Sequence, residues 1–131
     1  MSEDKKGIRT FVKWFVNPIL RNAAKLSFGP FALLRHVGRR SGKKYEIPIM
    51  VWPVKGGFVI ELTYGRKVDW LRNLQAAGQG SLRYHHREFV LQKPEFIDPA
   101  IGWRTLPGWT KPILRLSGEH EFVILPSQPA P

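Results

Sequence analysis

Glycine and proline divide the chain after Phe28 into short segments, and this division limits the possible fold more than any other feature. Between the breaks lie runs of apolar, aromatic and β-branched residues, which have the length and composition of strands in a packed sheet. The predicted strands cover residues 31–37, 45–52, 58–63, 82–84, 88–91, 95–97 and 122–125. Because the crossover helices of a parallel sheet are missing, the pattern predicts an antiparallel sheet, and its short strands favour a barrel.

Turn residues indicate how these strands connect. Residues 38–42 (Gly-Arg-Arg-Ser-Gly) predict a hairpin or loop, and residues 55–57 (Lys-Gly-Gly) predict a hairpin turn between the second and third strands. Residues 85–87 predict a further turn. The second strand is apolar on both faces apart from Glu46, as in a buried strand, and Pro48 within it predicts a bulge or a missing ladder hydrogen bond.

Two stretches show helical periodicity. Residues 7–26 repeat apolar side chains at steps of three and four, with Arg and Lys on the other side, and Asn17-Pro18 divides this stretch into two short helices. We expect this segment to cover the open side of the barrel, with docking on a membrane surface as the alternative. Residues 68–77 predict one helix inserted between the hairpins, which ends at Gly78 in the left-handed conformation.

The whole chain, residues 1–131, is expected to form a single domain, because neither a repeat nor a linker interrupts it. The barrel core would span residues 31–125, and the proline-rich residues 126–131 would be a mobile tail. The absence of cysteine excludes disulfide scaffolds, thiolate metal sites and cysteine nucleophiles. No metal site is expected, and the lack of a signal peptide or a spanning apolar run predicts a cytoplasmic location.

The charge balance favours an anionic partner, with a role in solubility alone as the alternative. The chain has 21 basic and 10 acidic residues, a net charge of +11, which raises the local concentration of anions. Nucleic acid, anionic lipid and a polyanionic cofactor all fit this charge. The sequence contains no RNP, KH or helix-turn-helix pattern, so nucleic acid is not expected. The glycine-rich turn of a dinucleotide-binding Rossmann unit is also missing.

Two motifs have the chemistry of an anion site. In residues 38–44 (Gly-Arg-Arg-Ser-Gly-Lys-Lys), glycines expose backbone N–H groups while guanidinium groups and a hydroxyl supply donors to a phosphate or carboxylate. Residues 62–67 lead a strand through Gly65 and two cations into a helix, whose first turn attracts anions. Trp70 and Asn73 would share one face of that helix. The alternatives are a solvated basic turn, a core tryptophan and a loop-capping asparagine.

The order of these motifs resembles the deazaflavin-dependent nitroreductase family. The resemblance rests on residues 37–42 (Val-Gly-Arg-Arg-Ser-Gly), Pro48 six residues beyond Gly42, residues 63–65 (Thr-Tyr-Gly) and residues 69–74 (Asp-Trp-Leu-Arg-Asn-Leu). It covers about residues 31–91. It implies a mainly β fold, a split antiparallel β-barrel related to the flavin reductases and pyridoxamine-phosphate oxidases.

The resemblance also implies a cofactor and an activity. The cofactor is coenzyme F420, a deazaflavin with a phosphate and a glutamate tail, and the reaction is hydride transfer from its reduced ring to a quinone-, nitro- or enone-like acceptor. Tyr45 or Tyr64 would supply a proton or polarise the acceptor. The implied cofactor contacts are Arg39, Arg40, Ser41, Gly42, Pro48, Met50, Tyr64, Gly65, Trp70 and Asn73.

The chain also departs from the family pattern. Family members usually carry a further basic residue near the position of Tyr45, the loop between Gly65 and Trp70 is shorter here, and the acceptor-side tyrosines have no match near the carboxyl end. FMN therefore stays open as the cofactor. A non-catalytic barrel that holds a flavin, lipid or tetrapyrrole at the inner face of the membrane stays open as the alternative function.

Overall fold

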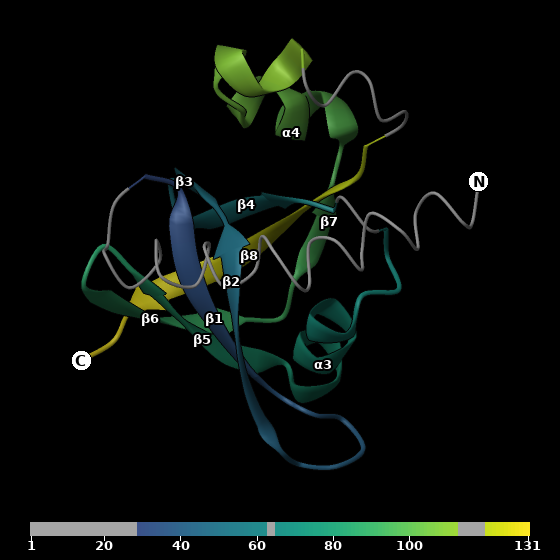
Figure 1. Ribbon diagram of the computed structural model, residues 1–131, viewed down its shortest axis with the longest axis vertical. Helices are drawn as coiled ribbons and strands as arrows, with labels where there is room; N and C mark the ends of the chain where they lie inside the picture. The colour runs from purple at the N-terminus through teal and green to yellow at the C-terminus, as the bar shows by residue number, and fades with distance from the viewer. Residues whose placement is uncertain (1–28, 63–64, 113–119) are drawn as a thin grey trace.

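The structure is a computed structural model that describes residues 29–62, 65–112 and 120–131. Its strands form one eight-stranded sheet in the order β2-β1-β5-β6-β8-β4-β3, with β7 also paired to β8 (Figure 1). The strands are β1 (Phe31–Val37), β2 (Lys44–Met50), β3 (Trp52–Val54), β4 (Gly57–Glu61), β5 (Gln79–Tyr84), β6 (Arg87–Gln92), β7 (Glu95–Ile97) and β8 (Phe122–Pro129). The helices within these described ranges are α3 (Asp69–Ala77), α4 (Pro99–Thr105) and the 3-10 turn η2 (Gly108–Thr110).

The predicted fold class is confirmed: the protein is mainly β, and its antiparallel sheet curls into a half-barrel. All strand pairs are antiparallel. Strand β8 holds the sheet together, because it pairs with β4 along one edge and with both β7 and β6 along the other. The predicted helical segment at residues 7–26 lies outside the described residues. In the described parts of the chain, no helix is long and apolar enough to cross a membrane.

The hydrophobic core lies on the inner face of the curled sheet. Strand β4 shows the alternation that builds it: Phe58 and Ile60 join the main core, and Val59 between them packs into a second cluster with Leu106 and Phe122 on the opposite face. Helix α3 packs Leu71 and Leu74, both fully buried, against the main core. Burial of each such side chain contributes about 1.5–3 kcal/mol, which orients α3 relative to the sheet.

The predicted second strand is wrong in its extent and in its partner. The chain between residues 45 and 52 divides at Val51, which is fully buried and whose N–H donates to the Pro30 carbonyl at 2.8 Å. Only Trp52–Val54 form the predicted hairpin with β4, whereas β2 pairs with β1. Strand β2 is at the edge of the sheet, so Pro48 fits without a bulge and the register runs unbroken through it.

The carboxyl-terminal tail was also predicted incorrectly. Residues 126–129 are the second half of β8 and pair with β6 and with Gly57. Prolines are depleted in strands, which is why the sequence pattern suggested a tail. The backbone N–H groups beside these prolines nevertheless have partners: Ser127 donates to the Gly56 carbonyl at 2.9 Å and Ala130 to the Glu88 carbonyl at 2.9 Å.

Candidate functional site

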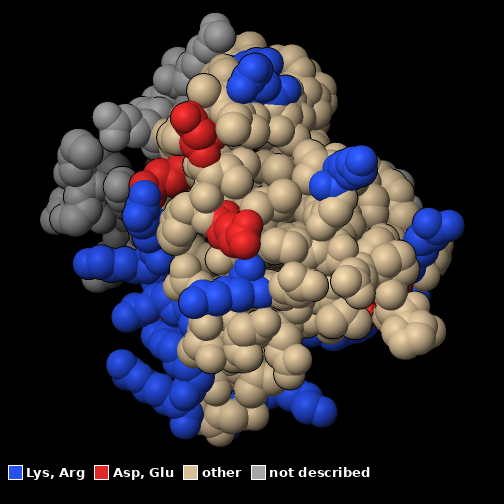
Figure 2. All heavy atoms as spheres, turned by 180° about the vertical axis from the view of Figure 1, so that it is seen from behind, with Lys and Arg blue, Asp and Glu red and all other residues tan. Residues whose placement is uncertain are grey.

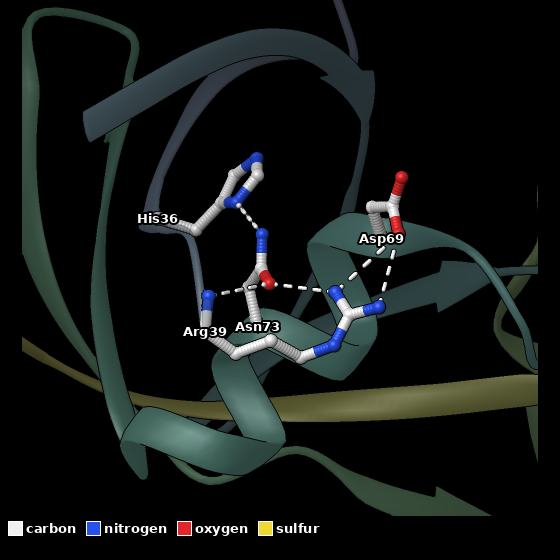
Figure 3. A network of polar contacts seen from close by, with 4 residues as sticks. All are labelled: His36, Arg39, Asp69 and Asn73. Atoms are coloured by element: carbon white, nitrogen blue, oxygen red, sulfur yellow. Dashed lines mark hydrogen bonds and ion pairs between the residues drawn. The ribbon is translucent and has the colours of Figure 1, made fainter. Parts of the chain in front are cut away.

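The two motifs singled out in the sequence meet in the structure, where the β1–β2 turn lies against the first turns of α3. Asn73 makes the connection (Figure 3). Its Oδ1 accepts hydrogen bonds from the Arg39 backbone N–H at 3.1 Å and from Arg39 Nη1 at 2.9 Å. The same Nη1 lies 3.3 Å from Asp69 Oδ1. The guanidinium of Arg39 is therefore held in place by residues one turn apart on α3.

His36 extends this network into the core. Because both donors of Arg39 point at Asn73 Oδ1, the amide nitrogen of Asn73 faces His36, and Nδ2 donates to His36 Nδ1 at 2.9 Å. His36 Nδ1 then carries no proton, so the neutral ring is protonated at Nε2. Within the described residues, Nε2 is buried without a hydrogen-bond partner. Burial lowers the pKa of His36, and the nearby Asp69 carboxylate opposes this to a smaller extent.

Exposed cations surround this network. Figure 2 shows Lys and Arg gathered at the end of the molecule that carries the β1–β2 turn and α3. Arg66 is engaged, since it pairs with Glu121 at 2.6 Å and lies over the Phe96 ring. In contrast, a set of exposed cations has no ion pair within the described ranges. We call this set the basic cluster: Arg40, Lys43, Lys44, Lys67 and Arg72.

The backbone beside the basic cluster leaves donors available. The N-cap residue of α3 is Val68, which has no side chain that can accept a hydrogen bond from the first turn. In the β1–β2 turn, Gly42 has φ +70° and has open space at the position of a Cβ. Ser41 Oγ accepts from the Lys43 N–H at 3.2 Å, which fixes the turn while leaving the hydroxyl proton for another partner.

The structure brings only some of the remaining predicted residues into the candidate site. Tyr45 is 43% exposed and stacks on His36, so it belongs to the site. Trp70 packs against the main core. Tyr64 lies outside the described residues, which resume at Gly65. Pro48 and Met50 point away from α3. Their neighbours Ile47 and Ile49 face the main core beside α3, and successive strand residues face opposite sides.

His36 is a residue of the candidate site that the sequence patterns missed. It follows Ala32 and Leu34 on the inward face of β1, at alternate positions that normally hold apolar side chains. A histidine at a strand position that normally holds an apolar side chain was the signal in the sequence that could have identified it.

Among the described residues, no cluster of three or more His, Asp or Glu side chains has the arrangement of a metal site.

Comparison with known proteins identifies solved structures that share the architecture of this chain. No protein-family model matches the chain, and no curated protein matches it. An F420-H2-dependent reductase, FDR-A, superposes with a TM-score of 0.54 at 17% identity, over 72% of this chain and 93% of that chain. A Clostridium acetobutylicum protein related to general stress protein 26, of the pyridoxinephosphate oxidase family, superposes with a TM-score of 0.54 at 11% identity, over 83% and 82%.

The fold is a split β-barrel. The identities are low, so the likeness concerns the arrangement of the chain and not its chemistry. Within this split barrel, the basic cluster, the β1–β2 turn and the start of α3 form one continuous polar end. Its chemistry suits a ligand with several negative charges, since exposed cations, a hydroxyl and a helix start without a side-chain cap occur in these elements.

Proposed function

We propose that the protein is an oxidoreductase that binds coenzyme F420 with its phosphate and glutamate tail on the basic cluster. The proposal rests on the exposed cations of the basic cluster, which have no ion pair within the described ranges, and on the start of α3, which has no side-chain cap. The charge of Asp69 in this first turn is offset by Arg39. Anions are stabilised at such a helix end by the exposed N–H groups and by the helix dipole. An F420-H2-dependent reductase shares this fold, so the architecture is compatible with F420, and the choice of F420 comes from the resemblance in the sequence motifs.

The residues present fit the anionic part of this cofactor. Arg40 and Lys43 are exposed and unpaired within the described chain, and Gly42 leaves room for a phosphate close to the backbone. Arg39 has a different part in the proposal. Because Asp69 already offsets its charge, Arg39 would hold the turn in the binding geometry while Arg40 contacts the anion.

When bound, the deazaflavin would supply the hydride that reduces a quinone-, nitro- or enone-like acceptor. The protein would orient the cofactor through its tail and keep the turn rigid through the His36–Asn73–Arg39 network. Tyr45, exposed beside His36, and Tyr64 remain the proposed donors of the accompanying proton. FMN has a single phosphate and would use fewer of the cations.

Titration of F420 against its own fluorescence tests this proposal. We expect saturable binding, and we expect Arg40→Gln to weaken it about tenfold, the effect of one charge-assisted hydrogen bond. The matched control is Arg83→Gln, because Arg83 is also exposed but lies on β5 near the other end of the barrel. An unchanged affinity in the Arg40 variant, or no binding at about 50 μM F420 where a cofactor should saturate, would overturn it.

Parallel titration with FMN tests whether the protein prefers F420 to another flavin-like cofactor. Tighter binding of FMN than of F420 would contradict the deazaflavin assignment, because a basic cluster of this size should favour the ligand with more negative charges. Raising the salt concentration should weaken F420 binding more than FMN binding for the same reason.

A further inference from the structure

A pocket lies at the opposite end of the barrel from the basic cluster. It has a volume of about 520 Å³ and opens between the β3–β4 turn, the β5–β6 turn and the end of β8. Tyr84 in its wall pairs with Ala32 at the start of β1, whereas the β1–β2 turn follows the end of β1. A strand of that length spans about 20 Å, so the pocket is separate from the proposed cofactor-tail site. Ligand sites in barrels favour such mouths, and this volume suits a small molecule.

The floor of the pocket is aromatic. Phe58 is 3% exposed and packs edge-on against Tyr84, with ring centroids 5.4 Å apart, and against Phe89 at 5.0 Å. Aromatic side chains in this arrangement present edges and faces that suit another flat ring. Burial raises the pKa of the Tyr84 phenol further above its ordinary value of 10, so its hydroxyl is protonated at neutral pH, as an unshifted phenol would also be.

The rim of the pocket is cationic. Its lining includes Arg87 and His85 but no acidic residue. Arg87 is exposed, and within the described chain it has no ion pair, whereas its neighbour Glu88 is held by Arg35 at 2.7 Å. A guanidinium without a carboxylate partner beside an aromatic floor is suited to a carboxylate on a flat ring.

The β5–β6 turn is built in an unusual way beside this rim. His85 and His86 have φ of +48° and +66°, a conformation for which asparagine and glycine are preferred. The His85 ring stacks on Tyr84, with centroids 3.9 Å apart, and its Nε2 lies 2.6 Å from the Gly29 carbonyl oxygen. These contacts hold the histidine ring as a fixed part of the pocket wall.

We propose that this pocket binds a small planar aromatic carboxylate, with its ring against the partly exposed Phe89 and its carboxylate at Arg87. The ligand is distinct from the proposed cofactor, and the site does not depend on F420 binding. It also lies too far along β1 from the cofactor-tail site to share a phosphate or glutamate group with it.

The test uses 2-naphthoate and its neutral counterpart 2-naphthamide as probes, with amide chemical shifts of the full chain as the readout. We expect 2-naphthoate to shift the amides of Gly57, Tyr84 and Ser127, and 2-naphthamide to bind about tenfold more weakly because it cannot form the ion pair. Equal affinity of the two probes, or shifts confined to residues 38–44, would overturn the proposal. This comparison needs no substitution.

Substitutions then locate the carboxylate. Arg87→Gln should weaken 2-naphthoate binding about tenfold and leave 2-naphthamide binding unchanged. Arg83→Gln is the matched control, since Arg83 is an exposed arginine on the same hairpin that points to the other side of the sheet from its neighbour Tyr84. An Arg87 variant that binds 2-naphthoate as tightly as the unmodified chain overturns the assignment. So does displacement of 2-naphthoate by F420, whereas failure of F420 to bind affects only the proposed function.

Discussion

Asn73 and His36 explain how two distant parts of the sequence form one polar end. Asn73 is 4% exposed and uses its amide on both sides: Oδ1 holds the β1–β2 turn through Arg39, and Nδ2 holds His36 in the core. A buried amide with its oxygen and nitrogen both engaged fixes the relative position of the elements that it joins. The arrangement requires a neutral His36, because a proton on Nδ1 would face the donor of Asn73.

This requirement predicts a loss of stability in acid. The pKa of His36 in the folded protein lies below its ordinary value of 6.5, so the unfolded chain binds the proton more readily. The contribution of His36 is complete above about pH 6.5 and falls as the pH drops below that value towards the folded pKa. Urea unfolding at pH 7.5 and pH 5.5 should therefore show a lower free energy of unfolding at pH 5.5.

The control for this prediction is His36→Gln, which removes the titrating group while other histidines remain. The difference between the two pH values should be smaller in the variant than in the unmodified protein. An equal difference would mean that the acid sensitivity comes from other groups.

At the scale of elements, the β5–β6 hairpin contains the clearest local strain. Its turn consists of His85 and His86, both with positive φ, between Tyr84 and Arg87. The sequence predicted a turn here, and the structure places Arg87 in β6 instead of in the turn. A β-carbon in the left-handed region costs about 1–2 kcal/mol, which packing of the surrounding strands must offset.

Replacement of His86 by glycine should therefore stabilise the protein. Glycine removes the left-handed strain but gains flexibility in the unfolded chain, which costs about 0.5–1 kcal/mol, so the expected net gain is about 0.5–1 kcal/mol. The measurement is the urea midpoint. His86→Val is the opposing control and should destabilise, because a β-branched residue fits positive φ poorly. If both variants had the same stability, strain at this residue would not matter.

At the scale of the whole molecule, β8 joins the strands on its two sides into one sheet. Its first half pairs with β7, its second half pairs with β6, and β4 lies along the other edge. Without the second half, β6 would lose its partner on that side, and the aromatic floor around Phe58 and Phe89 would lose the strand that closes it.

Deletion of residues 126–131 distinguishes this role from that of a mobile tail. We expect a loss of about 3 kcal/mol or more in the free energy of unfolding, from the lost ladder hydrogen bonds and the exposed core. Thermal unfolding measures the effect, and a chain that lacks only the exposed Pro131 is the control. Equal melting temperatures for both truncated chains would show that residues 126–130 do not contribute to the stability of the protein.

The sequence alone determined the features that depend on neighbouring residues. The strand at residues 31–37, the helix that ends at Gly78 with φ +72° and the turn at His85 and His86 follow from local composition and periodicity and from the conformations that glycine and short turns allow. Tertiary structure decided what depends on partners far along the chain. Arg39 meets Asn73 and residues 126–129 meet β6 only when the sheet curls, because local propensity contains no information about which distant donor or strand edge will be left unpaired.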